Sequence, residues 1–242
     1  MTDAVKTLKT WLAESSRIVF FGGAGVSTES GIPDFRSVDG LYNLKYDEPP
    51  EEIISHSYFL RRTEQFYKFY KDKMLYPEAQ PNACHRALAK LEAEGKLSAV
   101  LTQNIDGLHQ KAGSKKVIEL HGTTLQNYCM KCGKAFGVDY ILDAPGVPKC
   151  DKCGGTVKPD VVLYEESLHD GDMDEAARLI RKADLFIIGG TSLTVYPAAG
   201  LVNYYRGDRL VLINKSETPY DSYANLVIHE SIGEVFSQCV SL

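Results

Sequence analysis

Short, fully apolar segments recur along the chain, and each one runs into small or polar residues. The first, Arg17 to Phe21, leads directly into Gly22-Gly-Ala-Gly25. Similar segments follow at residues 99–101, 117–120, 185–188 and 210–213, with helical patterns between several of them. Apolar strands that alternate with helices are typical of a parallel sheet covered on both faces. We therefore predict an α/β fold built on a doubly wound parallel sheet.

Two stretches interrupt this alternation. From Ile32 to about Pro50 the chain is rich in Pro, Asp, Gly, Asn and Tyr without periodicity, which predicts a long loop leading into a helical segment at residues 52–73. From Thr124 to Pro159 the chain has glycine and proline turns and two CxxC pairs. We expect this second stretch to be an insert between elements of the sheet.

The cysteine spacing is the strongest purely chemical signal. Cys129 and Cys132 form one CxxC pair, and Cys150 and Cys153 form another after 17 intervening residues. This spacing fits a four-thiolate zinc site in a reducing compartment, with free thiols or redox pairs as the alternatives. Four thiolates complete a tetrahedron, so the zinc is expected to be structural. Cys84 and Cys239 lie on apolar helical stripes and are expected to pack internally.

The glycine-rich segment after the first strand reads Gly23-Ala24-Gly25-Val-Ser-Thr28 and approximates GxGxxG. Such a turn lets backbone amides approach a pyrophosphate, although a tight structural turn is the alternative. An ordinary dehydrogenase is disfavoured, because the next 20 residues hold no second strand with an acidic ribose ligand. A serine hydrolase is also disfavoured, since Glu29 stands where GxSxG requires glycine and the stretch at 190–194 ends in Thr194.

Polar residues follow several predicted strands where ligands bind in open α/β sheets. Gln103-Asn104-Ile105-Asp106 follows the strand ending at Leu101, with a helix cap as the alternative role. His121 follows residues 117–120 and is a candidate general base or a structural histidine. The other histidines are predicted to be surface or packing residues. Gly190-Thr191-Ser192 and Asn214 follow two further strands and could hold the ribose and adenine of a dinucleotide.

Net charge and hydropathy limit the classes of binding partner and the cellular location that we expect. A net charge of -5 gives no general attraction to nucleic acid or to an anionic membrane, and cationic protein tails are more natural partners. No apolar stretch approaches the roughly 18 residues of a membrane span, and the N-terminal residues lack a signal-peptide pattern. We therefore expect a cytoplasmic protein.

Taken in order, these motifs resemble one family. The segment from Gly23 to Arg36 reads GAGVSTESGIPDFR, and it is followed by Thr102-Gln-Asn-Ile-Asp106, His121-Gly122, the four cysteines and Gly190-Thr-Ser192. The chain resembles the sirtuins of bacterial type over essentially its whole length. The resemblance implies a Rossmann-like doubly wound sheet with a small zinc-binding domain inserted. It divides the chain into a large domain (1–31, 76–123 and 160–242), a cofactor loop with helices (32–75) and a zinc ribbon (124–159).

The resemblance also implies site residues. NAD as a co-substrate and an acetylated-lysine protein or peptide meet in the cleft between the domains. The residues implied to bind NAD are Gly23, Ala24, Gly25, Thr28, Phe35, Arg36, Gln103, Asn104, Ile105, Asp106, His121, Gly190, Thr191, Ser192, Asn214 and Ile232. His121, Asn104 and Asp106 are the implied catalytic residues. The peptide is implied to add as a strand at Val161, Val162, Leu163 and Tyr164.

The implied activity is NAD-dependent deacetylation of protein lysine, with release of nicotinamide and an O-acyl-ADP-ribose. Protein ADP-ribosylation and a catalytically silent NAD or acyl-lysine reader are the alternatives. Two departures bear on the substrate: Glu165 stands where many sirtuins have glycine, and Tyr70 stands where desuccinylating relatives have arginine. Because Tyr70 offers a carboxylate no bidentate partner, we expect an uncharged acyl group, whereas Glu165 bears on the peptide preference. We also expect a monomer with one structural zinc ion.

Overall fold

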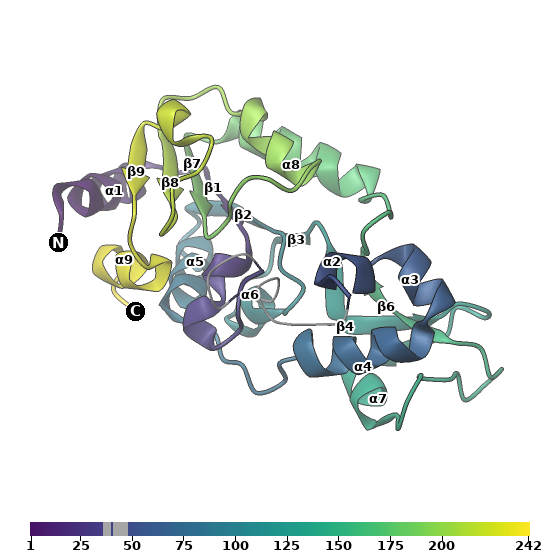
Figure 1. Ribbon diagram of the computed structural model, residues 1–242. Coiled ribbons are helices and arrows are strands. Elements are labelled where there is room, and N and C mark those ends of the chain that lie inside the picture. Colours follow the sequence, from purple (N-terminus) through teal and green to yellow (C-terminus); the bar gives the residue numbers. More distant parts are fainter. Residues whose placement is uncertain (36–39, 41–47) are drawn as a thin grey trace.

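The protein is described here by a computed structural model that covers residues 1–35, residue 40 and residues 48–242. Its larger part is a six-stranded sheet in the order β3-β2-β1-β7-β8-β9, with every neighbouring pair parallel (Figure 1). The strands are β1 (Ile18–Gly22), β2 (Leu97–Thr102), β3 (Val117–Glu119), β7 (Leu185–Gly189), β8 (Leu210–Ile213) and β9 (Leu226–Ile228). The predicted doubly wound parallel sheet is confirmed.

Side-chain alternation explains why this sheet is covered on both faces. Along β1, Phe20 belongs to the apolar cluster on one face, whereas Val19 and Phe21 belong to the cluster on the other. The first cluster is completed by α1 (Asp3–Glu14), α5 (Ala83–Ala93) and α9 (Ile232–Cys239). The second is completed by α8 (Asp170–Lys182) and the 3-10 helix Ala198–Tyr204. Strands buried on both faces must be apolar throughout, as these are.

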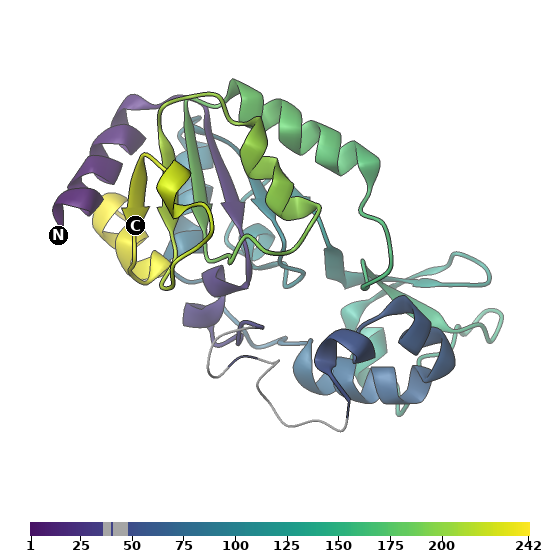
Figure 2. The ribbon, with the colours of Figure 1, turned by 45° about the horizontal axis from the view of Figure 1, so that its top comes forward.

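A smaller module lies beside this sheet (Figure 2). It contains a three-stranded antiparallel sheet in the order β5-β4-β6, together with four helices. Its elements are α2 (Pro50–Ile53), α3 (His56–Arg61), α4 (Thr63–Lys73), β4 (Gly122–Cys129), β5 (Ala135–Gly137), α7 (Val138–Asp143) and β6 (Val157–Val161). Phe59, Phe66, Tyr67 and Tyr70 form its buried aromatic core with Val157. Two separate stretches of sequence therefore build one module, while the domain limits given above stay a prediction.

Strand register brings the carboxyl ends of four strands to one edge of the large sheet. Gly22 pairs with Thr102 on one side and with Gly189 on the other, and Gly189 pairs with Ile213. The short helix α6 (Leu108–Lys111) follows β2 at this edge. Residues that follow these strands must therefore lie close together, which is the usual position of a ligand site. Among the described residues no helix combines the length and apolar character needed to cross a bilayer.

Candidate active site and zinc centre

A cavity of about 1030 Å³ lies at this edge and extends to the small module. The structure brings together every predicted NAD-site and peptide-site residue that it describes. The cavity lining includes Gly23, Ala24, Gly25, Thr28, Phe35, Gln103, Asn104, Ile105, Asp106, His121, Val161, Val162, Leu163, Tyr164, Gly190, Thr191, Ser192, Asn214 and Ile232. Arg36, the remaining predicted residue, lies outside the described part of the chain.

The glycine loops after β1 and β7 press against each other at the floor of the cavity. The Gly25 N–H donates to the Gly190 carbonyl at 2.8 Å. A Cβ on Gly25 would lie 2.8 Å from the Gly190 Cα, and one on Gly190, whose φ is +60°, would lie 2.4 Å from the Val26 nitrogen. Only glycine fits this close approach of the two loops, and both glycines line the cavity.

A buried polar cluster joins the first glycine loop to the loop after β2. The Ser27 hydroxyl donates to Asp106 Oδ2 at 2.6 Å, and Asn104 Nδ2 donates to the Ser27 oxygen at 3.1 Å. Asp106 Oδ1 also accepts the Leu108 N–H at 2.9 Å. Burial raises the pKa of Asp106, while the Ser27 and Leu108 donors oppose that rise. The cap of the following helix is Gly107, without a side-chain cap bond, so Asp106 is not the predicted N-cap, although it accepts the first N–H of that helix from the residue before the cap.

Ser27 was not among the predicted site residues, although it lies inside the glycine motif. Its side chain is 1% exposed, so its hydroxyl has no role at the surface. A hydroxyl within a glycine-rich phosphate loop, followed by an acidic residue after the neighbouring strand, was the signal that could have identified it. The structure shows that Ser27 connects two predicted catalytic residues.

His121 has a defined tautomer in this setting. Its Nδ1 lies 3.0 Å from the Gln103 carbonyl oxygen, which can only accept a hydrogen bond. Nδ1 therefore carries the proton of the neutral ring, and Nε2 keeps a free lone pair. Desolvation lowers the pKa of His121, against a smaller opposing effect of the Gln103 bond. The ring is consequently neutral near pH 7 and has the protonation state of a general base.

Gln103 and Thr191 link the two sides of the cavity. Gln103 Nε2 donates to Thr191 Oγ1 at 2.9 Å, so the residue that orients His121 also contacts the loop after β7. Thr191 Oγ1 further accepts the Leu193 N–H at 3.3 Å. Asn214 follows β8, and its Nδ2 donates to the Ser216 carbonyl at 2.7 Å. These polar contacts shape the part of the cavity beyond the glycine loops.

The segment 161–164 runs from β6 along the cavity, with its amides largely engaged inside the protein. The Val162 N–H donates to the His121 carbonyl at 2.9 Å, and the Tyr164 N–H to the Ile54 carbonyl at 3.1 Å. The Leu163 N–H donates to Glu166 Oε2 at 2.8 Å. Three carbonyls of the segment are engaged as well: Val161 accepts from Lys158 Nζ, Leu163 from the Glu166 N–H and Tyr164 from the His56 N–H.

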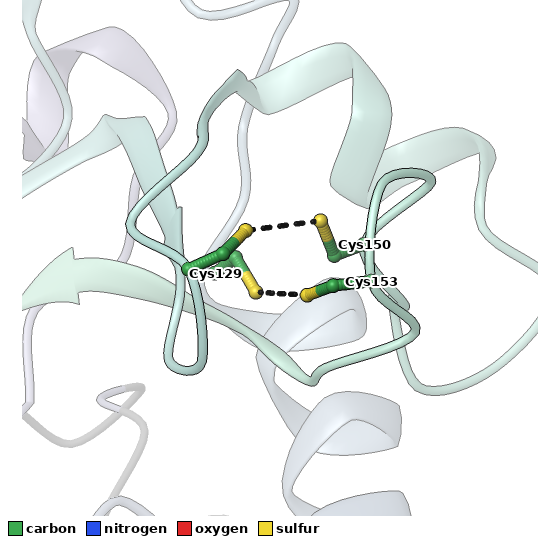
Figure 3. A group of neighbouring side chains, drawn as sticks. Cys129, Cys150 and Cys153 are labelled. Carbon is green, nitrogen blue, oxygen red and sulfur yellow. Dashed lines mark hydrogen bonds between the residues drawn. The ribbon is translucent and has the colours of Figure 1, made fainter.

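The four cysteines converge in the small module (Figure 3). Their Sγ atoms all lie within 4.8 Å of one another, with Cys129 and Cys153 at 3.4 Å and Cys132 and Cys150 at 3.7 Å. Zn–S bonds of about 2.3 Å in a tetrahedron place sulfurs roughly 3.8 Å apart, so the group fits zinc. A Cβ on Gly155 would lie 2.9 Å from the Cys129 sulfur, which explains the glycine there.

The comparisons with known proteins agree with this geometry. The model of the Sir2 family matches residues 23–197. The chain is 60% identical to an NAD-dependent protein deacetylase of Clostridium perfringens, covering 99% of this chain and all of that protein. It is 57% identical to one of Clostridium acetobutylicum, covering 99% of both.

Solved structures of similar fold include ligand complexes. A Sir2 structure with a deacetylated p53 peptide and 3'-O-acetyl ADP-ribose superposes with a TM-score of 0.89 at 41% identity, covering 98% of this chain and 99% of that one. A Sir2 homologue in complex with NAD gives a TM-score of 0.87 at 40% identity, covering 97% and 91%. The fold, the cavity and these likenesses agree, and this chain belongs to the Sir2 family.

Proposed function

We propose that this chain is an NAD-dependent protein-lysine deacetylase. An acetyl-lysine, NAD and water are converted to lysine, nicotinamide and O-acetyl-ADP-ribose. The observation that carries the proposal is the position of His121: its ring, with an unprotonated Nε2, lines the same cavity as the glycine loops, Asn104 and Asp106. The closely related proteins named as NAD-dependent deacetylases support the same activity.

NAD is the co-substrate, and it supplies an activated ribose carbon that accepts the acyl oxygen as nicotinamide leaves. In this proposal the bare backbone at Gly23, Gly25 and Gly190 faces the phosphates, with Ala24 and Thr28 beside them. Thr191, Ser192, Asn214 and Ile232 hold the adenosine half. Phe35 shields the reacting carbon from water, and Arg36 is assigned to the phosphates from the sequence alone.

Asn104 and Asp106 orient the nicotinamide and its ribose, together with Gln103 and Ile105. Their positions are fixed before any ligand enters, because Ser27 bonds both Asn104 and Asp106. A reaction that builds positive charge on the ribose is favoured by groups that need no reorganisation. His121 Nε2 takes the proton from a ribose hydroxyl, and the Gln103 carbonyl stabilises the protonated ring through Nδ1.

The acyl-lysine peptide lies against Val161, Val162, Leu163 and Tyr164 as an added strand. The acyl group is acetyl or another uncharged chain, because Tyr70 lines the cavity where an arginine would be needed to pair with a carboxylate. Tyr70 is itself buried and stacked on Phe66, with ring centroids 5.5 Å apart. This fixed aromatic wall favours apolar acyl chains.

The zinc-binding cysteines hold the small module that carries segment 161–164. A closed four-thiolate site leaves no position for water, so the metal has a structural role. Thiolates held for metal fit a reducing compartment, and a cytoplasmic location is part of the proposal. The net charge of -5 supports cationic protein segments, and not nucleic acid, as partners. The proposal treats the chain as a monomer.

Mass spectrometry of an acetyl-lysine peptide incubated with the protein and NAD tests the activity. Loss of the acetyl group supports deacetylation. Gain of an ADP-ribose group would support protein ADP-ribosylation instead, and an unchanged peptide with no nicotinamide formed would support a silent reader. Either of the last two results would contradict the proposal.

A further inference from the structure

Two adjacent glutamates, Glu165 and Glu166, follow the peptide segment and line the cavity, but their surroundings differ. Glu166 is half-buried, and two side chains contact its carboxylate: Lys158 Nζ lies 3.1 Å from one oxygen, and His56 Nδ1 lies 2.7 Å from the other. The same carboxylate accepts the Leu163 N–H. Burial would raise the pKa of Glu166, but these contacts outweigh it and lower the pKa. The carboxylate therefore helps to hold residues 161–164 in place.

Glu165 is exposed and has no salt bridge among the described residues. Its carboxylate accepts two hydrogen bonds from one uncharged residue, from the Ser57 N–H at 2.8 Å and from the Ser57 hydroxyl at 3.0 Å. Arg61 contacts the same serine, donating to the Ser57 carbonyl at 3.2 Å and to the Ser57 hydroxyl at 3.4 Å, but it forms no direct ion pair with Glu165 among the described residues. Hydrogen bonds of this kind orient a carboxylate but leave its negative charge available to a third group.

The backbone adds a second constraint. Glu165 has a φ of +75°, a conformation that favours glycine, and one other non-glycine residue in the described chain has positive φ. Glycine would be the conformationally easier residue at this position. The side chain is thus retained against a local cost, and the two Ser57 bonds hold it at the cavity rim. Among the described residues, two lysines line the same cavity, Lys73 and Lys215. Lys73 lies 2.9 Å from Asp72, and neither lysine forms a salt bridge with Glu165.

We propose that Glu165 is a specificity-determining residue that favours acyl-lysine peptides with arginine or lysine close to the modified lysine. The inference rests on the proposed deacetylase function and names its substrate class. A peptide added along residues 161–164 passes directly beside Glu165 in sequence and in the cavity. A cationic side chain there meets a carboxylate that has no direct ion pair among the described residues, whereas an acidic one meets a like charge.

The test is a peptide series that differs only in charge. Arg, Gln or Glu is placed in turn at each of the two positions on either side of one acetyl-lysine, and kcat/KM is measured for each peptide. For at least one position we expect the Arg peptide to exceed the Glu peptide by roughly five- to tenfold at low salt. In Glu165→Gln, whose amide oxygen can still accept from Ser57, this ratio falls to about twofold or less. The wild-type ratio also shrinks at 0.5 M salt.

Glu64→Gln is the matched control, because it removes the same charge from the same module at an exposed residue outside the cavity lining. We expect Glu64→Gln to keep the wild-type ratio of kcat/KM between the Arg and Glu peptides. Two results would overturn the inference: an equal Arg-to-Glu ratio in wild type and Glu165→Gln, or a loss of kcat/KM in the variant that is the same for all peptides. Either would show that Glu165 only stabilises the local structure. If Glu165→Gln did not fold, a wild-type ratio that was absent or independent of salt would overturn it equally. Absence of turnover on every peptide would contradict the proposed function itself.

Discussion

The hydroxyl of Ser27 lies 2.6 Å from the carboxylate of Asp106; Ser27 is buried, and Asp106 is partly buried in the cavity lining. Asn104 donates to the same hydroxyl, so one serine fixes the relative positions of two residues from the loop after β2. Ser27 itself comes from the glycine loop after β1. The contact thus joins the part of the cavity assigned to phosphate with the part assigned to nicotinamide.

Ser27→Ala is expected to lower kcat/KM for NAD by at least about tenfold. The change leaves the Asp106 oxygen and the Asn104 amide without a shared partner, and an unsatisfied buried polar group costs about 1–3 kcal/mol. Steady-state kinetics with NAD as the varied substrate measures the effect. Ser237→Ala serves as the control, because that hydroxyl bonds only a carbonyl of its own helix on the exposed face of α9. Equal activity in both variants would show that the Ser27 hydroxyl does not support catalysis.

His121→Ala is expected to abolish turnover while NAD binding and the melting temperature stay close to those of wild type. Loss of a general base typically costs about 10²–10⁴ in rate. In wild type, kcat/KM should fall on the acid side as His121 gains a proton. Because burial lowers the pKa of His121 below 6.5, the midpoint of this fall lies below pH 6.5. A profile that loses activity already between pH 8 and pH 7 would contradict the neutral-base assignment.

Removal of zinc is expected to disorder the small module and inactivate the enzyme. Thiolate coordination supplies much of the stability of such a module, and its aromatic core packs directly against Cys129 and Cys150. Chelation with metal analysis, near-UV circular dichroism and an activity assay test this together. The large sheet should keep its far-UV signal. Full activity after confirmed loss of the metal would be inconsistent with a structural site.

The buried pair of His85 and His109 is expected to make the fold sensitive to acid. Their ring centroids lie 4.6 Å apart, and burial lowers the pKa of His85 to about 4 and holds the pKa of His109 well below its usual value of 6.5. The unfolded chain therefore binds more protons between pH 6.5 and pH 4, so stability falls as pH falls through this window. Each proton contributes up to about 1.4 kcal/mol per pH unit.

His85→Gln is the variant that tests this acid sensitivity. His85 Nδ1 accepts the Asn82 N–H in a capping box, and a glutamine oxygen can take that role without titrating. Denaturant unfolding of both proteins from pH 4 to pH 7 should show a smaller pH slope in the variant. Identical slopes would show that His85 does not titrate on unfolding.

The sequence predicted the sheet well because its strands are buried on both faces and are therefore continuously apolar. The strands at 17–21, 185–188 and 210–213 were found within one or two residues. The strand Leu226–Ile228 was not anticipated, since Leu226 and Val227 are only partly buried and the segment is three residues long. Local periodicity carries little signal in so short an edge strand.

The candidate site, like the sheet, was predictable only in part. Residues directly after strands, such as Asn104 and His121, were predictable because sheet geometry gathers them at one edge. Contacts between distant side chains were not: the bonds of Glu165 to Ser57 and of Asn82 to the Val26 carbonyl join elements far apart in sequence. Such bonds depend on how the modules pack, which no spacing along the chain reveals.

The most direct test of the central claim is the stoichiometry of the products. In a reaction with NAD and an acetyl-lysine peptide, nicotinamide, deacetylated peptide and O-acetyl-ADP-ribose are quantified by mass spectrometry at several early times. We expect equal amounts of all three products, because acetyl transfer and cleavage of the nicotinamide bond are one coupled reaction. Deacetylated peptide accompanied by free acetate, with no nicotinamide formed, would contradict it.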